Sequence, residues 1–367
     1  MGDLTRATKP QSMSEPASIP VINLEPWFHG SNVDRLELAR RLGESCHQFG
    51  FFYIENHGLD ADLCYRYMDL LKRFFDLSEQ EKFRIHKQHS PQFRGWEQLG
   101  SERTNNQVDF REQIDIGLEH KAYDNPSPYY LALVGPNQWL PESSLPGFRA
   151  MVTDYLTAVS RLSRDLLRML SVALGLDRDH IVRLFGEAPS PYLKLIRYPE
   201  DHQNQMGVNA HKDSGFITIL LQDEQPGLEA QAANGEWIAV DPIPGTLVIN
   251  VGELMQMLSC NYFIAAPHRV RNISHRVRYS SAFFDHPDLT ASILPLPIDQ
   301  GLLDRVQSSP RHRDAGLMPS LSEMSQGVGN MKSKTKPTVV GEKYWRRWVR
   351  SYPDIARNYY SEDLINR

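Results

Sequence analysis

The chain has 367 residues and a formal net charge of −5. This acidic balance argues against a nucleic-acid partner, and no apolar run approaches the ~18 residues that a membrane span needs. The three cysteines, Cys46, Cys64 and Cys260, are odd in number and widely spaced, which is typical of reduced thiols. We therefore expect a soluble cytoplasmic protein of one large or two modest domains, without an obligate protein partner.

Helices dominate the first half of the predicted layout. Residues 1–18 are polar and rich in Pro and Ser, which predicts a flexible tail. Asp60 is a candidate N-cap, and Ser78-Glu-Gln-Glu81 predicts a capping box. Residues 19–189 are therefore expected to form a mainly helical region that packs on a later barrel. Apolar side chains recur at helical spacing in three segments of this region, residues 34–48, 60–76 and 147–174.

Short strands separated by turns are predicted from about residue 190 onward. Asp223-Glu-Gln-Pro-Gly227 is a turn signal, and Asn234-Gly235 between apolar segments predicts a hairpin. Helices followed by strands favour a mainly β fold with flanking α-helices. A sheet closed into a double-stranded β-helix, or jelly roll, protects its edges and leaves a ligand-sized mouth. We expect this barrel over residues 190–322.

The segment after the barrel has two interpretations. Residues 323–340 are rich in Ser, Gly and Lys, which predicts either a flexible loop or a lid that orders over the barrel mouth. Residues 341–367 include Tyr344-Trp-Arg-Arg-Trp-Val-Arg350 and are expected to form a C-terminal helix that docks on the body. The whole chain is then one globular unit.

Two histidines and one carboxylate stand out as candidate metal ligands: His211, Asp213 and His268. Such donors hold Fe(II) on one face and leave its other positions open. Residues i and i+2 of a strand point to the same side, so His211 and Asp213 can bind one ion from a single extended segment. The run Phe216-Ile-Thr-Ile-Leu-Leu221 directly after them is typical of a strand. A distant strand must then deliver His268.

His275 competes for the place of the third ligand, because His268-Arg-Val and His275-Arg-Val are near repeats. We prefer His268, since it follows the strand-like run Asn261-Tyr-Phe-Ile-Ala-Ala266. His275 lies in the polar stretch Arg271-Asn-Ile-Ser-His-Arg276, which predicts a solvated hairpin tip.

Two further His-x-Asp pairs are weaker candidates. His286 and Asp288 flank Pro287, which cannot donate to a strand ladder and argues for a turn. His312 and Asp314 lie in a polar stretch with no histidine downstream. Only the first pair has a following strand, a later histidine and a later Arg-x-Ser.

Arg278 and Ser280 form a candidate clamp for a carboxylate. They also obey the i, i+2 rule, within the strand-like run Tyr279-Ser-Ser-Ala-Phe-Phe284. The planar fork of arginine matches a carboxylate, and its charge persists. Together with the candidate metal ligands, this pair predicts a site that holds an iron and a small acid side by side, which points to oxygen chemistry.

Several stretches of the chain resemble the iron- and 2-oxoglutarate-dependent oxygenases of the isopenicillin N synthase-like family. They run in the family's order from about residue 19 to 285, and the step from His268 to Arg278 resembles the family's spacing. The stretches are Ile19-Pro-Val-Ile-Asn23, Phe49-Gly-Phe-Phe-Tyr-Ile-Glu-Asn-His-Gly58, Leu195-Ile-Arg-Tyr-Pro199, His211-Lys-Asp-Ser-Gly-Phe216, Gly227-Leu-Glu229, Pro244-Gly-Thr-Leu-Val-Ile-Asn-Val-Gly252, and Ala266-Pro-His-Arg-Val270 through Arg278-Tyr-Ser280.

The resemblance implies iron ligands at the three candidate positions and a 2-oxoglutarate carboxylate at Arg278 and Ser280. It also implies that Tyr198 faces the carboxylate of the cosubstrate or of the substrate. Many plant members of the family have Asn two residues before this tyrosine, where the present chain has Ile196. Leu195-Ile-Arg-Tyr-Pro199 is instead similar to isopenicillin N synthase itself, which uses no 2-oxoglutarate and whose Arg-x-Ser pair is thought to hold a substrate carboxylate.

Three functions are therefore compared. The first, favoured because most of the family uses 2-oxoglutarate, is an oxygenase that consumes 2-oxoglutarate and O2 and releases succinate and carbon dioxide. It would hydroxylate an unactivated C–H of a small organic metabolite, with desaturation or cyclisation as other outcomes. The second is an oxidase like isopenicillin N synthase. The third is a metal-binding module of the same shape without catalysis.

Substrate-pocket residues are harder to choose from the sequence. Candidates are Arg94, Trp96 and the segment Asp109-Phe-Arg-Glu-Gln-Ile-Asp115. Arg94 or Arg111 would suit an anionic substrate, although a surface salt bridge is the more common use of an arginine.

Overall fold

The computed structural model describes residues 18–200, 205–272, 275–315 and 338–367. Two predicted segments lie almost wholly outside this part of the chain. They are the tail, of which only residue 18 is described, and the loop at 323–340, of which only residues 338–340 are described. Within the described residues, no helix combines the length and the apolar character needed to cross a bilayer.

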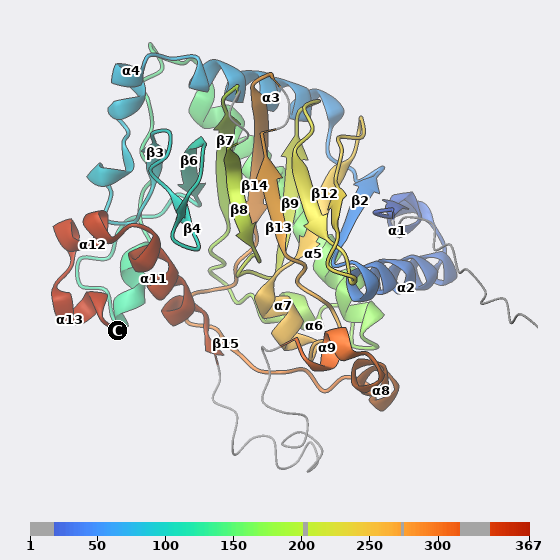
Figure 1. Cartoon of the computed structure of the whole chain (residues 1–367). Coiled ribbons are helices and arrows are strands. Elements are labelled where there is room, and N and C mark those ends of the chain that lie inside the picture. The colour runs from blue at the N-terminus through green and yellow to red at the C-terminus, as the bar shows by residue number, and fades with distance from the viewer. Residues whose placement is uncertain (1–17, 201–204, 273–274, 316–337) are drawn as a thin grey trace, which may run out of the picture.

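Two sheets form the jelly-roll core, as the sequence predicts (Figure 1). The large sheet has the order β1-β2-β12-β9-β14-β7-β6-β3, and the small sheet has the order β11-β10-β13-β8. Neighbouring strands are antiparallel except for β1 and β2. The strands of the large sheet are β1 (Val21–Asn23), β2 (Phe51–Glu55), β3 (Gly95–Glu97), β6 (Glu112–Gly117), β7 (Tyr192–Tyr198), β9 (Ile217–Gln222), β12 (Leu247–Val251) and β14 (Arg278–Phe284).

The small sheet lies across the inner face of the large one and contains the predicted hairpin. Its strands β10 and β11 pair on either side of Asn234-Gly235, and Gly235 has the positive φ of 86° that such a turn requires. The strands of the small sheet are β8 (Met206–His211), β10 (Leu228–Gln231), β11 (Trp237–Ala239) and β13 (His268–Arg271). Two separate two-stranded sheets pair β4 (Arg103–Thr104) with β5 (Gln107–Val108) and β15 (Ser292–Ile293) with β16 (Thr338–Val339).

Alternation along the strands divides the apolar core into two clusters. Leu195, Ile219 and Phe283 point outward from the large sheet and join a cluster shared with the helices. Ile196 and Val248 have the opposite parity and join a smaller cluster between the sheets. The inner face therefore combines this apolar cluster with the polar side chains of the site.

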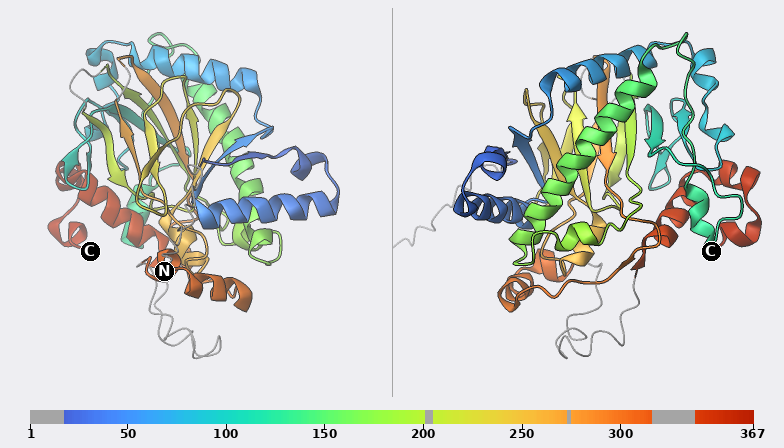
Figure 2. Two further views of the ribbon diagram at one scale, coloured as in Figure 1. Left: turned by 45° about the vertical axis from the view of Figure 1, so that its right-hand side comes forward. Right: turned by 180° about the vertical axis from the view of Figure 1, so that it is seen from behind.

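Helices cover the outer face of the large sheet. The longest, α5, crosses the back of the sheet (Figure 2, right), and its buried stripe includes Val159, Leu162 and Leu166. Each such side chain contributes about 2 kcal/mol by its burial. Gly175, with a φ of 72°, follows the helix and permits the left-handed turn that ends it. The helices before the barrel are α1 (Glu25–His29), α2 (Asn32–Gln48), α3 (Ala61–Phe75), α4 (Glu79–Phe83), α5 (Phe148–Ala173) and α6 (His180–Arg183).

The predicted N-caps of α3 and α4 agree with the structure, whereas the capping box at the start of α2 was not predicted. The Asp60 carboxylate accepts a hydrogen bond from the N–H of Asp62 and caps α3, and the Ser78 hydroxyl accepts from the N–H of Glu81. The full capping box lies at α2 instead, where Ser31 and Asp34 satisfy each other's backbone N–H groups.

The predicted boundary at residue 190 does not coincide with an edge of the sheet. The region before it is mainly helical, but it also supplies β1, β2, β3 and β6, half of the large sheet. These strands are short, and helices separate β1, β2 and β3 from one another. Their pairing with strands far along the chain therefore leaves little local signal.

The C-terminal region corrects a second expectation. In place of one helix over 341–367, the structure has three short helices, and Pro353 separates the first two because it cannot continue a helix beyond Tyr352. They pack beside the β3–β6 end of the large sheet (Figure 1). The helices after the first barrel strands are α7 (Glu253–Leu258), α8 (Gln300–Ser308), α9 (Pro310–Arg313), α11 (Val340–Ser351), α12 (Pro353–Tyr359) and α13 (Glu362–Ile365).

Candidate active site

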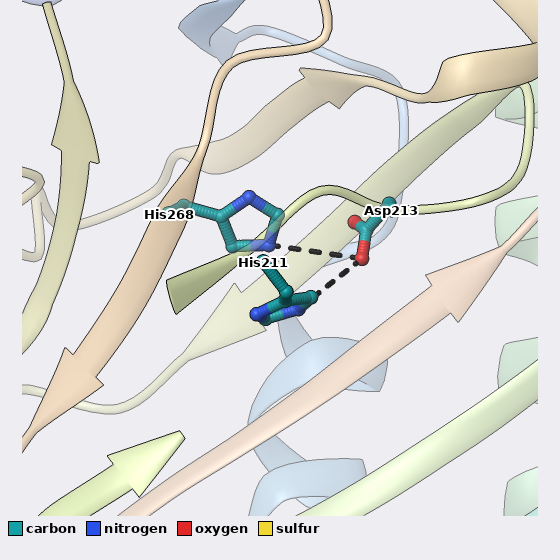
Figure 3. A group of neighbouring side chains, drawn as sticks. All are labelled: His211, Asp213 and His268. Carbon is teal, nitrogen blue, oxygen red and sulfur yellow. Dashed lines mark ion pairs between the residues drawn. The ribbon is translucent and has the colours of Figure 1, made fainter. Parts of the chain in front are cut away.

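The three predicted metal ligands converge at one end of the small sheet. His211 ends β8, His268 begins β13, and the two residues pair directly in the ladder between these strands. Asp213 follows two residues after β8, and its Oδ1 lies 3.5 Å from Nε2 of His211 and 3.7 Å from Nε2 of His268 (Figure 3). Among the described residues they form the one group of this kind, with candidate ligand atoms within 4.8 Å of one another.

Backbone carbonyls orient both imidazoles toward the same point. Nδ1 of His211 lies 2.8 Å from the carbonyl oxygen of Asn209, and Nδ1 of His268 lies 3.2 Å from that of Ala266. An Nδ1–H that donates to a carbonyl leaves the lone pair on Nε2, which is the form that binds a metal. Burial and the neighbouring His211 lower the pKa of His268 to about 4, which favours the same neutral form.

Two side chains from the large sheet fix the carboxylate of Asp213. Its Oδ2 accepts hydrogen bonds from the Thr218 hydroxyl at 2.5 Å and the Asn250 amide at 2.8 Å, which leaves Oδ1 facing the imidazoles. Burial alone would raise the pKa of Asp213, but His268, His211 and Thr218 together hold it well below its ordinary value. The carboxylate is therefore ionised and ready to bind a cation.

The sequence offered only a weak signal for these two supporting residues. Thr218 and Asn250 are polar positions inside apolar strands, at Ile217–Gln222 and Leu247–Val251. Period-2 alternation places both on the inner face, where β9 and β12 pair Thr218 with Asn250. Their relation to Asp213 depends on that pairing and cannot be seen along the chain.

The competing histidines occupy other places. His275 is not part of the group of three in the described chain. His286 is buried against the ring of Tyr344, with ring centroids 3.8 Å apart. His312 stacks on His47 beneath α2, with ring centroids 4.1 Å apart. The structure thus favours His268 as the sequence interpretation did.

Arg278 and Ser280 point to the inner face of the large sheet, as their spacing predicts. They lie on β14 opposite Tyr198 and Ile196 of β7. Arg278 donates from Nη2 to Oε1 of Gln222 at 2.8 Å and from Nε to the carbonyl oxygen of Gln225 at 3.2 Å. Its guanidinium carbon lies 5.0 Å from the centre of the Tyr198 ring. Tyr198 therefore supports the face of the guanidinium.

The polar atoms left over in this pair fit a bound carboxylate. Nη1 of Arg278 and the Ser280 hydroxyl are buried and have no hydrogen-bond partner among the described residues. Both side chains are almost fully buried, and unpaired buried donors carry a desolvation cost that an anionic ligand would remove. The donor set thus suits a small acid, and the three ligands beside it suit a divalent metal.

A cavity of about 1640 Å³ opens from the metal ligands toward the C-terminal helices. His211 and Asp213 line one side of it, and Arg347 and Arg350 of α11 line another, whereas neither Arg278 nor Ser280 does. The candidate carboxylate clamp is therefore separate from the lining of this cavity, whereas two of the three metal ligands belong to it. This arrangement leaves room for two different molecules around one metal.

A buried set of charged residues forms one side of the barrel interior, and we call it the ionic wall. Glu102 accepts from Arg111 at 2.7 Å and from Lys194 at 2.8 Å, and Lys87 pairs with Asp115 at 2.6 Å. The strand register of β3, β6 and β7 places several of these side chains on the inner face. The members of the ionic wall are Lys87, Glu97, Glu102, Asp109, Arg111, Asp115 and Lys194.

Arg94, Trp96 and Arg111, which were predicted for the substrate pocket, are buried in the interior instead. Arg111 forms buried ion pairs within the ionic wall rather than surface ones. Trp96 is buried and donates from Nε1 to Glu112 at 3.0 Å. Arg94 is buried against Gly117, where an added Cβ would lie 2.5 Å from its Nη2. None of these three lines the cavity. Apart from the metal ligands His211 and Asp213, the residues that line it, such as Glu97 of β3 and Arg347 of α11, were missed.

Two family models match the chain. Residues 19–142 match the N-terminal region described as "non-haem dioxygenase in morphine synthesis", and residues 189–287 match the 2OG-Fe(II) oxygenase superfamily. The second match contains all three metal ligands and the Arg278–Ser280 pair.

Curated relatives and solved structures agree with these matches. The chain is 33% identical over 302 residues to the 2-oxoglutarate-dependent dioxygenase frbJ of Dothideomycetidae sp. (strain 11243), covering 79% of this chain and 81% of that protein. It is 30% identical over 296 residues to homoarginine-6-hydroxylase 2-ODD-C23 of Glycine max, covering 76% and 88%. The fold matches that of a full-length Neurospora crassa protein solved in complex with alpha-KG and thymine, with a TM-score of 0.72, 24% identity and coverage of 91% and 97%. The chain therefore belongs to the 2OG-Fe(II) oxygenase superfamily, most of whose members use Fe(II), 2-oxoglutarate and O2.

Proposed function

We propose that this oxygenase oxidises an unactivated C–H of a small organic metabolite, with iron held by His211, Asp213 and His268. The observation that carries the proposal is the convergence of two free Nε2 atoms and one fixed carboxylate oxygen. The same barrel holds a buried anion clamp with unpaired donors, and a large cavity is lined by His211 and Asp213. With iron, 2-oxoglutarate and O2 bound, the metal centre supplies the oxidative chemistry and releases succinate and carbon dioxide.

The chain's own residues hold and orient the reactants. Arg278 and Ser280 bind the far carboxylate of 2-oxoglutarate, since Nη1 and the hydroxyl lie on the same strand face and are buried donors without a partner among the described residues. Tyr198 keeps the guanidinium in place through its ring. The apolar inner cluster around Ile196 keeps water away from this side of the barrel.

The substrate enters through the cavity bordered by α11, which is lined by the metal ligands His211 and Asp213. Hydroxylation of the substrate is the simplest outcome. Desaturation or cyclisation would begin with loss of the same hydrogen atom and would differ only in what the substrate carbon does next. One relative is a homoarginine-6-hydroxylase, which makes basic amino acids one class of compound to test. We infer that the enzyme acts as a single chain.

The reaction class is tested by quantifying succinate with purified protein, Fe(II), 2-oxoglutarate and O2. Succinate should form only when all three are present, and His211→Ala should abolish it. Oxygen consumption that needs iron and a substrate but no 2-oxoglutarate would instead support an oxidase like isopenicillin N synthase. Iron binding without either activity would support a non-catalytic module.

We also infer that the protein works in the cytoplasm. Its three cysteines form no disulfide, and Cys46 and Cys260 are buried, which suits a reducing compartment. Cell fractionation followed by immunodetection tests this inference, and recovery from a secreted fraction would contradict it.

A further inference from the structure

Glu97 is a buried carboxylate that has no partner. It is 4% exposed and lines the cavity, and its side chain makes no hydrogen bond or ion pair with any described residue. The other three carboxylates of the ionic wall are all paired with a cation. Burial raises the pKa of Glu97, although Lys87 opposes this effect. An unpaired buried carboxylate is costly, and a cationic ligand would remove that cost.

Arg347 is a cation that lines the same cavity. Its Nη1 donates to the Tyr192 hydroxyl at 2.5 Å, and its guanidinium carbon lies 5.5–5.9 Å from the ring centres of Tyr192, Phe284 and Trp348. No carboxylate of the described residues lies within 4.0 Å of it. The aromatic rings fix the fork before any ligand arrives, which lowers the entropy lost on binding.

The two unpaired charges are fixed by different parts of the fold. Glu97 belongs to β3 at the edge of the large sheet, and Arg347 belongs to α11, which packs beside that edge (Figure 1). No ion pair joins Glu97 to Arg347, so neither neutralises the other directly. Of the other cavity cations of α11, Lys343 pairs with Glu253 and Arg346 pairs with Glu342. Arg350 forms no ion pair among the described residues, but it is exposed, so its charge is already solvated.

We propose that the cavity binds a small zwitterionic substrate, with a terminal cationic nitrogen group at Glu97 and a carboxylate at the opposite end at Arg347. This inference rests on the proposed function, because it names the substrate class of the same site. A substrate held at both ends presents its intervening carbons to the metal ligands His211 and Asp213, which line the same cavity. The oxidised C–H then lies between the two charged groups.

The test uses the wild-type enzyme with two sets of matched compounds. L-Arginine is compared with L-citrulline, which has a neutral group in place of the guanidinium, and with agmatine, which lacks the carboxylate. L-Lysine is compared in the same way with L-norleucine and cadaverine. Binding to the anaerobic complex with Fe(II) and 2-oxoglutarate is measured by calorimetry, and stimulation of succinate formation is measured in air. In at least one set, the compound with both charged groups, L-arginine or L-lysine, should bind at least about 30-fold more tightly than either of its analogues.

Variants then assign each preference to its residue. Glu97→Gln should abolish the preference for L-arginine over L-citrulline and keep the preference over agmatine. Arg347→Gln should do the reverse, and Arg347→Lys should give an intermediate result, because lysine keeps the charge without the fork. Arg350→Met is the matched control: it removes an exposed cation at the same cavity and should change affinity by less than about threefold. Thermal unfolding checks that each variant is folded.

The outcomes separate this inference from the proposed function. Wild-type protein that binds Fe(II) and 2-oxoglutarate but neither L-arginine nor L-lysine, or that does not distinguish them from their analogues, overturns the zwitterion inference alone. Preferences that survive both Glu97→Gln and Arg347→Gln overturn the assignment of the two anchors. Wild-type protein that binds neither Fe(II) nor 2-oxoglutarate overturns the proposed function itself.

Discussion

Replacing Arg278 by glutamine should weaken 2-oxoglutarate binding strongly while iron still binds. Glutamine removes the charge and the Nη1 donor that has no protein partner in the described chain. Three supports hold the wild-type guanidinium in position: Gln222, the carbonyl of Gln225 and the ring of Tyr198. The metal ligands lie on other strands, so their geometry does not depend on this side chain.

The size of the effect follows from the burial of the clamp. Removing one partner of a buried, hydrogen-bonded charge pair costs 2–5 kcal/mol, and we take about 3 kcal/mol here. At about 1.4 kcal/mol per tenfold, this raises the dissociation constant of 2-oxoglutarate about 150-fold. Ser280→Ala removes one hydrogen bond to a charged group, worth about 1.5 kcal/mol, and should raise it about tenfold. Arg278→Lys should fall between the wild type and Arg278→Gln.

Anaerobic calorimetry of 2-oxoglutarate binding to the Fe(II)-loaded protein measures these constants. Arg271→Gln is the matched control, because Arg271 is an exposed arginine of β13 with only a long ion pair to Glu229, and its loss should leave the constant within about twofold. Circular dichroism confirms folding. If folded Arg278→Gln binds 2-oxoglutarate within about threefold of the wild type, the assignment of the clamp is refuted.

Three further results are expected. Thr218→Val should lower iron affinity about 10- to 100-fold without unfolding the protein, because it removes one of the two hydrogen bonds that fix Oδ2 of Asp213. Metal titration of the folded variant measures this, and an unchanged affinity would exclude Thr218 as a positioning residue. Burial raises the pKa of Asp285 to about 6 despite its ion pair with Arg164, so the contribution of Asp285 to the free energy of unfolding falls as pH rises from about 4 to 6. In urea unfolding, Arg164→Met should destabilise the protein by about 3 kcal/mol at pH 8, where Asp285 is ionised, and by less at pH 5. An equal loss of stability at both pH values would count against this expectation. A thiol reagent should label only Cys64 in the native protein, because the other two cysteines are buried, and rapid labelling of all three would contradict the packing described above.

The metal ligands could be predicted from the sequence because the signal is local. His211 and Asp213 are two residues apart beside a recognisable strand, and His268 has the spacing to Arg278 that the family resemblance supplies. The helical stripes of α2, α3 and α5 are similarly local, since helical periodicity appears within a few turns. Both kinds of feature are therefore visible without knowledge of strand pairing.

The substrate side could not be predicted because it depends on contacts between distant segments. Glu97 lies on a three-residue strand, and Arg347 lies about 250 residues later on a helix whose pattern indicates packing alone. Only the pairing of β3 with β6 and the docking of α11 bring these charges to one cavity. Arg111 shows the reverse error: it was a plausible ligand for an anion, but it is already paired inside the barrel.

Anaerobic Fe(II) titration of the wild type, His268→Ala and His275→Ala tests the central claim most directly, because these two histidines precede identical Arg-Val pairs. The wild type and His275→Ala should each bind one iron per chain with similar affinity. His268→Ala should bind at least about 100-fold more weakly, since loss of a ligand exceeds the effect of losing its supporting hydrogen bonds. Unchanged binding in folded His268→Ala, or loss of binding in His275→Ala alone, would contradict the account.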